Sequence, residues 1–213
     1  MSGLTDNLDS IAEDIRAKLT AKDAAREKVL PLCRETIRFC SQSIRALHRQ
    51  EFQQAEEMLE SARKLLEEAD QVLANVSELS NIGFLHDAQK EFTEGNITLA
   101  LVTGKSLPRP EDLDVNPASY LNGLGEAVGE LRRYLLDNIR KGDLSRGEEL
   151  LSAMDEIYSV LVTMDFPDAI TGGLRRTTDM VRGVLEKTRS DLTLVIRQQS
   201  LEQRLEKLEK NTP

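Results

Sequence analysis

The sequence predicts an all-α protein, an elongated bundle of six to seven long antiparallel helices that forms one domain over residues 1–213. Apolar residues recur three and four positions apart along most of the chain, which is the helical period. Only 12 glycines and 6 prolines are present, so turns are few. No segment shows the alternation typical of a strand, and no repeat of 20–50 residues is visible. A long-helix bundle is therefore the expected architecture.

The first half of the chain predicts three helices. The first runs from Leu4 to Leu47, with a joint expected near Thr20. The second extends from about Glu51 to Leu79 and ends before an Asn-Ile-Gly sequence, and the third spans roughly Phe84 to Thr103.

The second half begins with the sequence GKSLPRPEDLDVNP, whose three prolines predict a loop. A fourth helix is expected from Pro117 to Lys141 and a fifth from Leu144 to about Met164. The last begins after Pro167, is softly interrupted at Gly172 and Gly173, and continues to Lys210. Its final leucines, 201, 205 and 208, suit either a short coiled coil or a frayed, solvated tail.

Composition limits the environment and the chemistry. No stretch approaches about 20 apolar residues and the start lacks the order of a signal peptide, so we expect a cytoplasmic protein without a membrane span. Cys33 and Cys40 lie seven residues apart, about 10.5 Å along a helix, which is too far for a disulfide and predicts core thiols. Helices of this length exceed what one subunit covers, which predicts self-association.

A cationic ridge is predicted on the first helix. Residues 26–49 carry six Lys or Arg against two Glu in a chain of net charge −9. At about 100° per residue, one face collects the following side chains: Arg34, Arg38, Arg45, His48 and Arg49. Such a ridge suits the phosphates of a polyanion, but it also suits a solvated face paired with acidic neighbours.

Two pairs of glutamates form the second candidate site. Glu91 and Glu94 share a face of the third helix, and Glu126 and Glu130 share a face of the fourth. Paired carboxylates on two helices can hold Mg²⁺ or Mn²⁺, although most such pairs are simply solvated. Glu126 and Glu130 lie opposite the apolar face of their helix, which favours exposure, while the neighbouring Gly123 and Gly129 leave room for close approach by a backbone or a ligand.

Several other classes of site lack support. The sequence holds no Gly-rich phosphate loop, no CxxC pair and no HExxH, and its two histidines give no basis for a Ser/His/Asp arrangement. With 4% aromatic residues, a base-stacking platform is also disfavoured.

Two segments resemble the translin family. The run DVNPASYLNGLGEAVGELRRYLLDNIRKGD, residues 114–143, is similar to the start of the family's C-terminal half. The run RETIRFCSQSIRALHR, residues 34–49, resembles its N-terminal helix, and KEFTEG and PRPEDLDV follow in the expected order. The resemblance covers nearly the whole chain.

This resemblance implies a function. Translin binds single-stranded RNA and DNA, the translin-associated factor X type carries a Mg²⁺-dependent endoribonuclease site, and single-gene relatives form homo-octamers around RNA. The four acidic positions of the catalytic type are filled here by Glu91, Glu94, Glu126 and Glu130, where Glu126 replaces the Asp of the eukaryotic catalytic subunit. The resemblance thus implies catalytic and metal-ligand roles for these glutamates and a nucleic-acid-binding role for the cationic ridge.

Three alternative functions remain open at this point. The first is a metal-dependent endoribonuclease that holds RNA within a homo-oligomeric shell, with the octamer implied by the family. The second is a translin-like oligomer that binds single-stranded RNA or DNA without cutting it. The third is a helical scaffold without affinity for nucleic acid.

Overall fold

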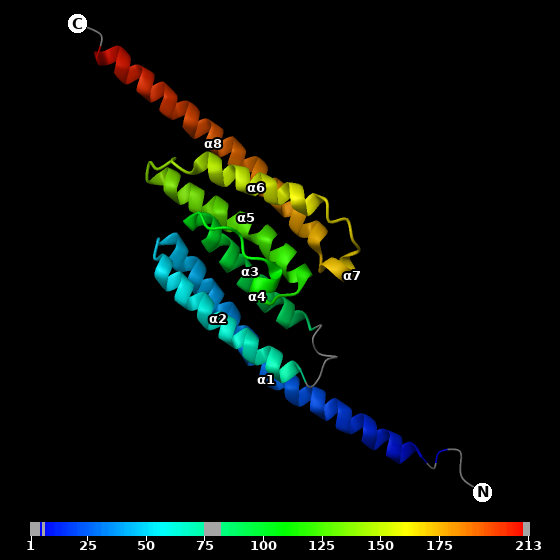
Figure 1. Ribbon diagram of the computed structural model, residues 1–213. Coiled ribbons are helices and arrows are strands. Elements are labelled where there is room, and N and C mark those ends of the chain that lie inside the picture. The colour runs from blue at the N-terminus through cyan, green and yellow to red at the C-terminus, as the bar shows by residue number, and fades with distance from the viewer. Residues whose placement is uncertain (1–4, 6, 75–81, 211–213) are drawn as a thin grey trace.

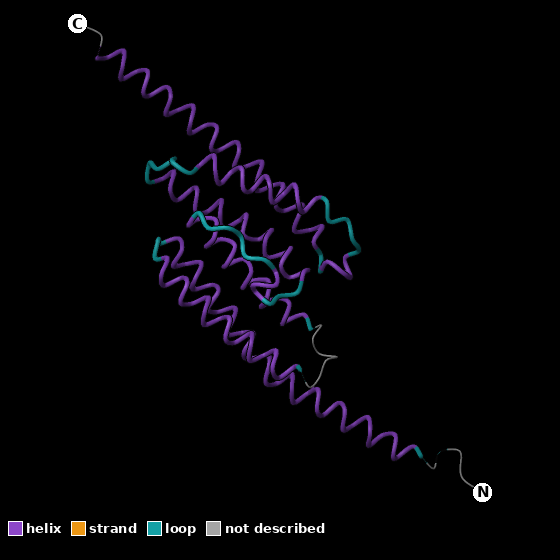
Figure 2. The backbone as a smooth tube through the Cα atoms, viewed as in Figure 1, coloured by secondary structure: helices purple, strands orange, loops and turns teal. Residues whose placement is uncertain are grey.

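The protein is a rod-like helical bundle (Figure 1), seen here in a computed structural model that describes residues 5, 7–74 and 82–210. Six long helices and two single-turn helices make up the described chain: α1 (Leu8–His48), α2 (Phe52–Leu73), α3 (Gly83–Thr103), α4 (Pro110–Leu113), α5 (Pro117–Arg140), α6 (Gly147–Val162), α7 (Asp168–Thr171) and α8 (Leu174–Lys210). No strand occurs among these residues (Figure 2). The all-α prediction is confirmed.

The helices pack in sequence across the bundle. α1 pairs with α2 along most of its C-terminal half, α3 packs against α1 and α5, and α5 is covered on its other side by α6 and α8. Small residues line the α1–α2 contact, as the fully buried Ala55, Ala62 and Ala69 show. α3 and α5 therefore lie at the centre of the molecule, where both faces of each helix have neighbours.

Three local expectations need correction, the first being the loop expected in GKSLPRPEDLDVNP, where Pro110–Leu113 form the single turn α4. α1 is continuous through Thr20, and even through Pro31, so the joint expected near Thr20 is absent. Pro31 is exposed, and the missing N–H leaves only one helical bond unmade while the opposite face stays packed on α2. The interruption at Gly172 and Gly173 is a full break, because both residues adopt positive φ angles of 60° and 84° and end α7 before α8 begins. The predicted end of the second helix at Leu79 lies outside the described residues.

The cysteine prediction is confirmed, since Cys33 and Cys40 are free thiols in the core. Burial, followed by the charge of Asp70, raises the pKa of the Cys33 thiol to about 11. None of the described helices combines the length and apolar character that a membrane crossing requires.

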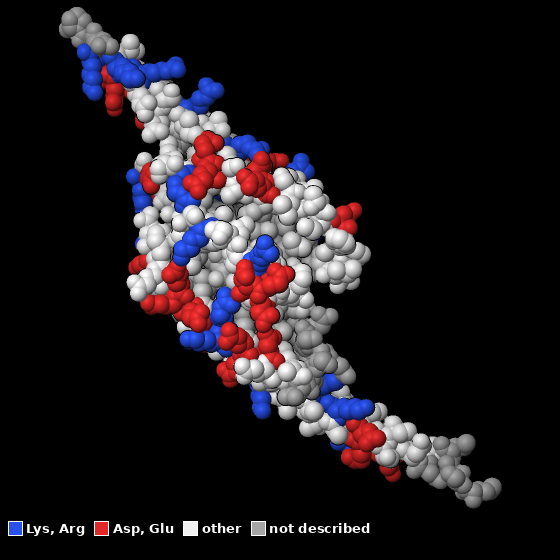
Figure 3. All heavy atoms as spheres, in the orientation of Figure 1, with Lys and Arg blue, Asp and Glu red and all other residues white. Residues whose placement is uncertain are grey.

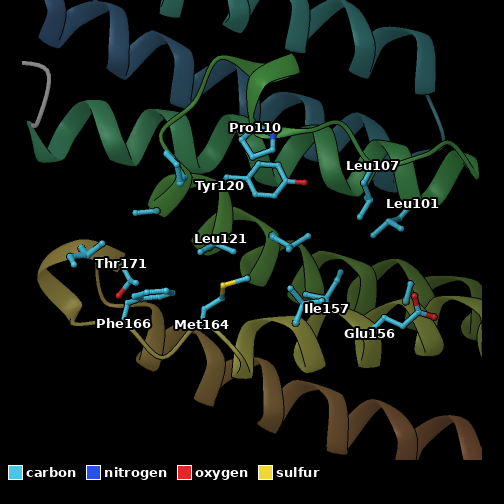
Figure 4. Close-up of a pocket in the computed structure, with 16 residues that line it drawn as sticks. Leu101, Leu107, Pro110, Tyr120, Leu121, Glu156, Ile157, Met164, Phe166 and Thr171 are labelled. Carbon is cyan, nitrogen blue, oxygen red and sulfur yellow. The ribbon is translucent and has the colours of Figure 1, made fainter.

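The ends of the rod and one side groove expose apolar surface. The first turns of α1 and the last turns of α8 project beyond the bundle and carry exposed leucines and isoleucines, among them Ile15 and Leu201. A groove of about 710 Å³ lies between the α4–α5 side and the α6–α7 side. Figure 4 shows Pro110 and Tyr120 on one wall and Ile157, Met164 and Phe166 on the other. On the face in Figure 3, acidic side chains form bands across the middle of the bundle, in keeping with the net charge of −9.

Candidate metal centre and nucleic-acid interface

Three glutamates meet between α3 and α5. Glu91 and Glu94 project from α3 and Glu126 projects from α5, and one carboxylate oxygen from each lies within 4.8 Å of the other two. All three side chains are half-buried. This acidic triad offers a set of oxygen ligands of the kind that hard divalent cations prefer.

Gly123 sets the distance between the two helices. A Cβ atom at this position would lie 2.6 Å from the carbonyl oxygen of Lys90 and 2.7 Å from Cβ of Thr93, distances that real Cβ contacts do not reach. Only glycine therefore allows α5 to approach α3 so closely. Glu126 follows three residues later on the same face, so the close approach carries it to Glu91 and Glu94. At Gly129, in contrast, an added Cβ would meet no atom of another helix within 4 Å.

The expected exposure of Glu126 and Glu130 is not observed. The side chains are 29% and 24% exposed, because the face of α5 opposite its main apolar stripe is covered by α3 and by the end of α1. The spacing of apolar residues in α5 did not reveal this second cover, since Lys90 and His48, which contact the two glutamates, lie on other helices.

Burial and neighbouring charges shift the pKa values of Glu91 and Glu94. Burial, followed by the charges of Glu91, Glu126 and Glu130, raises the pKa of Glu94 to about 8. The pKa of Glu91 is raised as well, mainly by burial, although the charge of Lys90 opposes the shift. A bound cation would relieve this repulsion and favour the ionised carboxylates.

Lys90 supplies a positive charge inside the cluster. Its Nζ donates to Oε1 of Glu126 at 2.8 Å. Burial lowers the pKa of the Lys90 ammonium, but the hydrogen bond and the charge of Glu126 outweigh this effect and the net shift is upward. Lys90 therefore stays charged and balances part of the negative charge. Sequence reasoning missed this residue, although it is the only lysine or arginine within α3.

Glu130 stands apart from the triad. Its Oε2 lies 2.5 Å from Nε2 of His48 and 3.8 Å from Arg133, and these contacts hold it one turn beyond Glu126 on α5. Its Oε1 has no hydrogen bond from any residue in the described part of the chain. The charge of Glu130 still contributes to the raised pKa values of Glu91 and Glu94, so it faces the same space.

The buried thiol of Cys40, on α1, lies near Glu91 and Glu94. Burial, followed by the charges of Glu91 and Glu94, raises the pKa of this thiol above its ordinary value. The cysteine therefore remains a neutral thiol and is a packing residue beneath the triad.

The predicted cationic ridge divides into two parts. Arg34, Arg38, Arg45 and Arg49 are exposed on or next to the C-terminal half of α1. Arg38 pairs with Glu35 and Arg49 with Glu51, whereas Arg34 and Arg45 form no ion pair with residues that the structure describes. The side chain of His48 is only 6% exposed and turns inward to Glu130. The arginines thus present a surface, and His48 joins that surface to the acidic cluster.

No family model matches the chain. An uncharacterized protein of Methanocaldococcus jannaschii is 28% identical over 192 residues, which cover 90% of this chain and 85% of that protein.

Solved structures give closer matches. AfC3PO in a complex with duplex RNA is 35% identical with a TM-score of 0.78, over 86% of this chain and 95% of that one. AfC3PO alone is 34% identical with a TM-score of 0.77, over 86% and 96% of the two chains. Apo-NeC3PO shares the fold, with 17% identity, a TM-score of 0.75 and coverage of 91% and 100%. AfC3PO is an archaeal member of the translin family. On this identity and coverage, the chain belongs to the translin family and to its archaeal-like members.

Proposed function

We propose that the protein is a Mg²⁺-dependent endoribonuclease that binds RNA within a homo-oligomeric shell. The observation that carries the proposal is the convergence of Glu91, Glu94 and Glu126 from two helices on one point. Mn²⁺, which prefers the same oxygen ligands, would serve in place of Mg²⁺.

The triad fits a small hard cation. Mg²⁺ takes oxygen ligands at about 2.0–2.1 Å, so two ligands on opposite sides of the ion are about 4.2 Å apart. The three glutamate oxygens lie within 4.8 Å of one another. Neighbouring ligands of an octahedral Mg²⁺ are about 2.9 Å apart, so movements of about 1–2 Å in these flexible side chains would bring the oxygens to ligand distance. The raised pKa values of Glu91 and Glu94 are what a set of carboxylates shows when no cation balances it.

Each residue then has a role in phosphodiester hydrolysis. A divalent cation would supply Lewis-acid activation of a phosphate oxygen and of the attacking water. Glu91, Glu94 and Glu126 would hold it, and Glu130, fixed by His48, would present its second oxygen to the cation or to the water. The ammonium of Lys90 would move from Glu126 toward the negative phosphate oxygens as the cation takes its place.

The exposed arginines would hold the RNA strand. Arg34 and Arg45 are the best candidates for phosphate contact, because neither is paired with an acid of the described chain. Contacts of this kind are independent of sequence and weaken as salt rises. The complex of AfC3PO with duplex RNA supports RNA as the ligand class.

The experiment that tests the function is RNA cleavage with and without a chelator. Labelled single-stranded RNA, incubated with the full-length protein, should be cut in Mg²⁺ and remain intact in EDTA. The double variant Glu126→Gln/Glu130→Gln should lose cleavage while it keeps RNA binding and assembly, whereas Glu67→Gln/Glu68→Gln, an exposed pair on α2, should cleave normally. Equal cleavage by the Glu126/Glu130 variant and the wild type would contradict the assignment.

One observation favours the non-catalytic alternative, a translin-like oligomer that binds single-stranded RNA or DNA. Lys90 already pairs with Glu126 and His48 with Glu130, so two of the four acids have partners in the protein itself. In that case RNA would be bound but would remain intact in both Mg²⁺ and EDTA.

A further inference from the structure

A second, polar cavity adjoins the acidic triad. It has a volume of about 430 Å³ and lies between α3, α5 and the first turns of α8. Lys90 and Glu126 line it, so the cavity opens directly beside the carboxylates. Its volume falls within the range of about 300–1,000 Å³ that is usual for sites of small organic ligands.

Positive charge enters this cavity from two helices. Lys90 comes from α3 and Arg176 from the first turn of α8. Arg176 forms no ion pair with any described residue, and one further acid, Asp87, lines the cavity beside Glu126. Ala118 and Ser119 in the first turn of α5 also line it.

The floor of the cavity is rigid. The Nδ2 of Asn122 donates to the carbonyl oxygen of Thr171 at 2.7 Å, and its Oδ1 accepts from the hydroxyl of Thr177 at 2.6 Å. These bonds tie α5 to both sides of the break between α7 and α8. A Cβ at Gly172 would lie 3.7 Å from Asn122, and the positive φ of 60° favours glycine there. The cavity is therefore held open before any ligand arrives.

One buried polar atom at this cavity has no partner. The Nε2 of His86 is buried and makes no hydrogen bond within the described residues, although the backbone carbonyl of His86 accepts from Ser119 at 3.1 Å. Buried side-chain nitrogens are normally paired, and an exception needs a physical reason. Because His86 lines the cavity, a rotation of its ring would bring this nitrogen to a ligand there.

We propose that this cavity binds a nucleotide unit of the RNA strand, next to the phosphodiester held at the triad, with its phosphate between Lys90 and Arg176. The inference rests on the proposed function in that RNA is taken as the source of the nucleotide. A phosphate accounts for Arg176, which no described acid pairs, and the polar groups of the nucleoside account for the size of the cavity and for the unpaired His86 nitrogen.

The test is the binding of adenosine 5′-monophosphate and of inorganic phosphate to the full-length protein in Mg²⁺, measured by calorimetry. We expect the nucleotide to bind more tightly than phosphate and Arg176→Ala to weaken its binding about tenfold. Arg175→Ala is the matched control, because this neighbouring arginine lines a different cavity and lies 4.0 Å from Asp165. His86→Phe should weaken binding of the nucleotide but not that of phosphate.

The outcomes separate this site from the proposed function. Absence of nucleotide binding, equal affinity for phosphate and nucleotide, or equal effects of Arg176→Ala and Arg175→Ala would overturn the nucleotide cavity, even if chelator-sensitive cleavage is present. Nucleotide binding that depends on Arg176, in a protein that never cuts RNA, would support the cavity and contradict only the nuclease.

Discussion

Glu94 has the most strongly raised pKa of the four predicted glutamates. It is more buried than Glu91, and its pKa of about 8 lies well above the ordinary value of 4.5. At neutral pH its protonated form is therefore favoured in the absence of a cation. Binding of a divalent cation requires the ionised form, so affinity for the cation should rise with pH through this range.

The pKa of Glu94 predicts how stability depends on pH. Between pH 4.5 and about 8 the folded chain keeps a proton on Glu94 that the unfolded chain has lost. In EDTA, where no cation is bound, the free energy of unfolding should therefore fall as pH rises, and Glu94 should contribute up to about 1.4 kcal/mol per pH unit to this fall. Denaturant unfolding in EDTA at several pH values measures the slope. Glu94→Gln should flatten it, and identical slopes for the two proteins would contradict the assignment.

A second prediction at the scale of residues concerns His48, whose Nε2 lies 2.5 Å from Oε2 of Glu130 and holds that side chain in place. His48→Leu should lower the cleavage rate about tenfold or more by releasing Glu130, with little effect on RNA binding by the exposed arginines. His48→Gln retains an N–H donor near Nε2 and should restore most of the activity. Melting temperatures control for loss of stability. If Leu and Gln variants of equal stability cleave equally well, His48 does not position Glu130.

The crossing of α3 and α5 determines the site at the scale of elements. Helical periodicity correctly placed Glu91 with Glu94 and Glu126 with Glu130, because spacing fixes which residues share a face. It did not show which helix each face meets. The contacts of Lys90 with Glu126 and of His48 with Glu130 join residues 36 and 82 positions apart, and no local pattern specifies such pairs.

The same difference between local spacing and packing between helices explains which features of the helices were predictable. The order of the six long helices was predictable from apolar spacing and from prolines and glycines, whereas the single-turn helix α4 was not, because it lies in the segment whose three prolines predicted a loop. The continuity of α1 through Pro31 is confirmed, because packing on α2 outweighs the local cost of the proline, whereas the joint expected near Thr20 is absent. Close approach at Gly123 was predictable as an option that glycine permits, while the open space at Gly129 became evident only from the packed helices.

Gly123 and Gly129 therefore make a matched pair for mutation. Gly123→Ala should destabilise the fold by about 1–3 kcal/mol, because the added methyl group meets the backbone of α3, and should also weaken binding of the cation by separating the helices. Gly129→Ala should be neutral or stabilise by up to about 1 kcal/mol through helix propensity. Thermal unfolding of both variants measures the difference. Equal stability would mean that the α3–α5 contact is looser than the structure shows.

At the scale of the whole molecule, apolar surface lies at both ends and along one side. Ile15 on α1, Leu201 on α8 and Phe166 beside the groove are 52%, 57% and 58% exposed. Surface of this kind is typical of proteins that associate. Self-association is therefore expected, in agreement with the assembly that the translin resemblance implies.

Light scattering on the full-length chain tests this expectation. The mass should be a multiple of the 23.9 kDa subunit, with eight subunits as the expected number. Leu201→Glu combined with Leu205→Glu should reduce the mass if the projecting end of α8 takes part. A monomer at micromolar concentration would contradict the expectation of a shell.

The central claim is that Glu91, Glu94 and Glu126 form one divalent cation site. Binding of Mn²⁺ to the full-length protein, followed by electron paramagnetic resonance, tests it without reference to catalysis. We predict saturable binding that weakens at least tenfold in Glu91→Gln/Glu94→Gln/Glu126→Gln and is unchanged in Glu67→Gln/Glu68→Gln. Equal Mn²⁺ affinity in the wild type and the triple variant would contradict it.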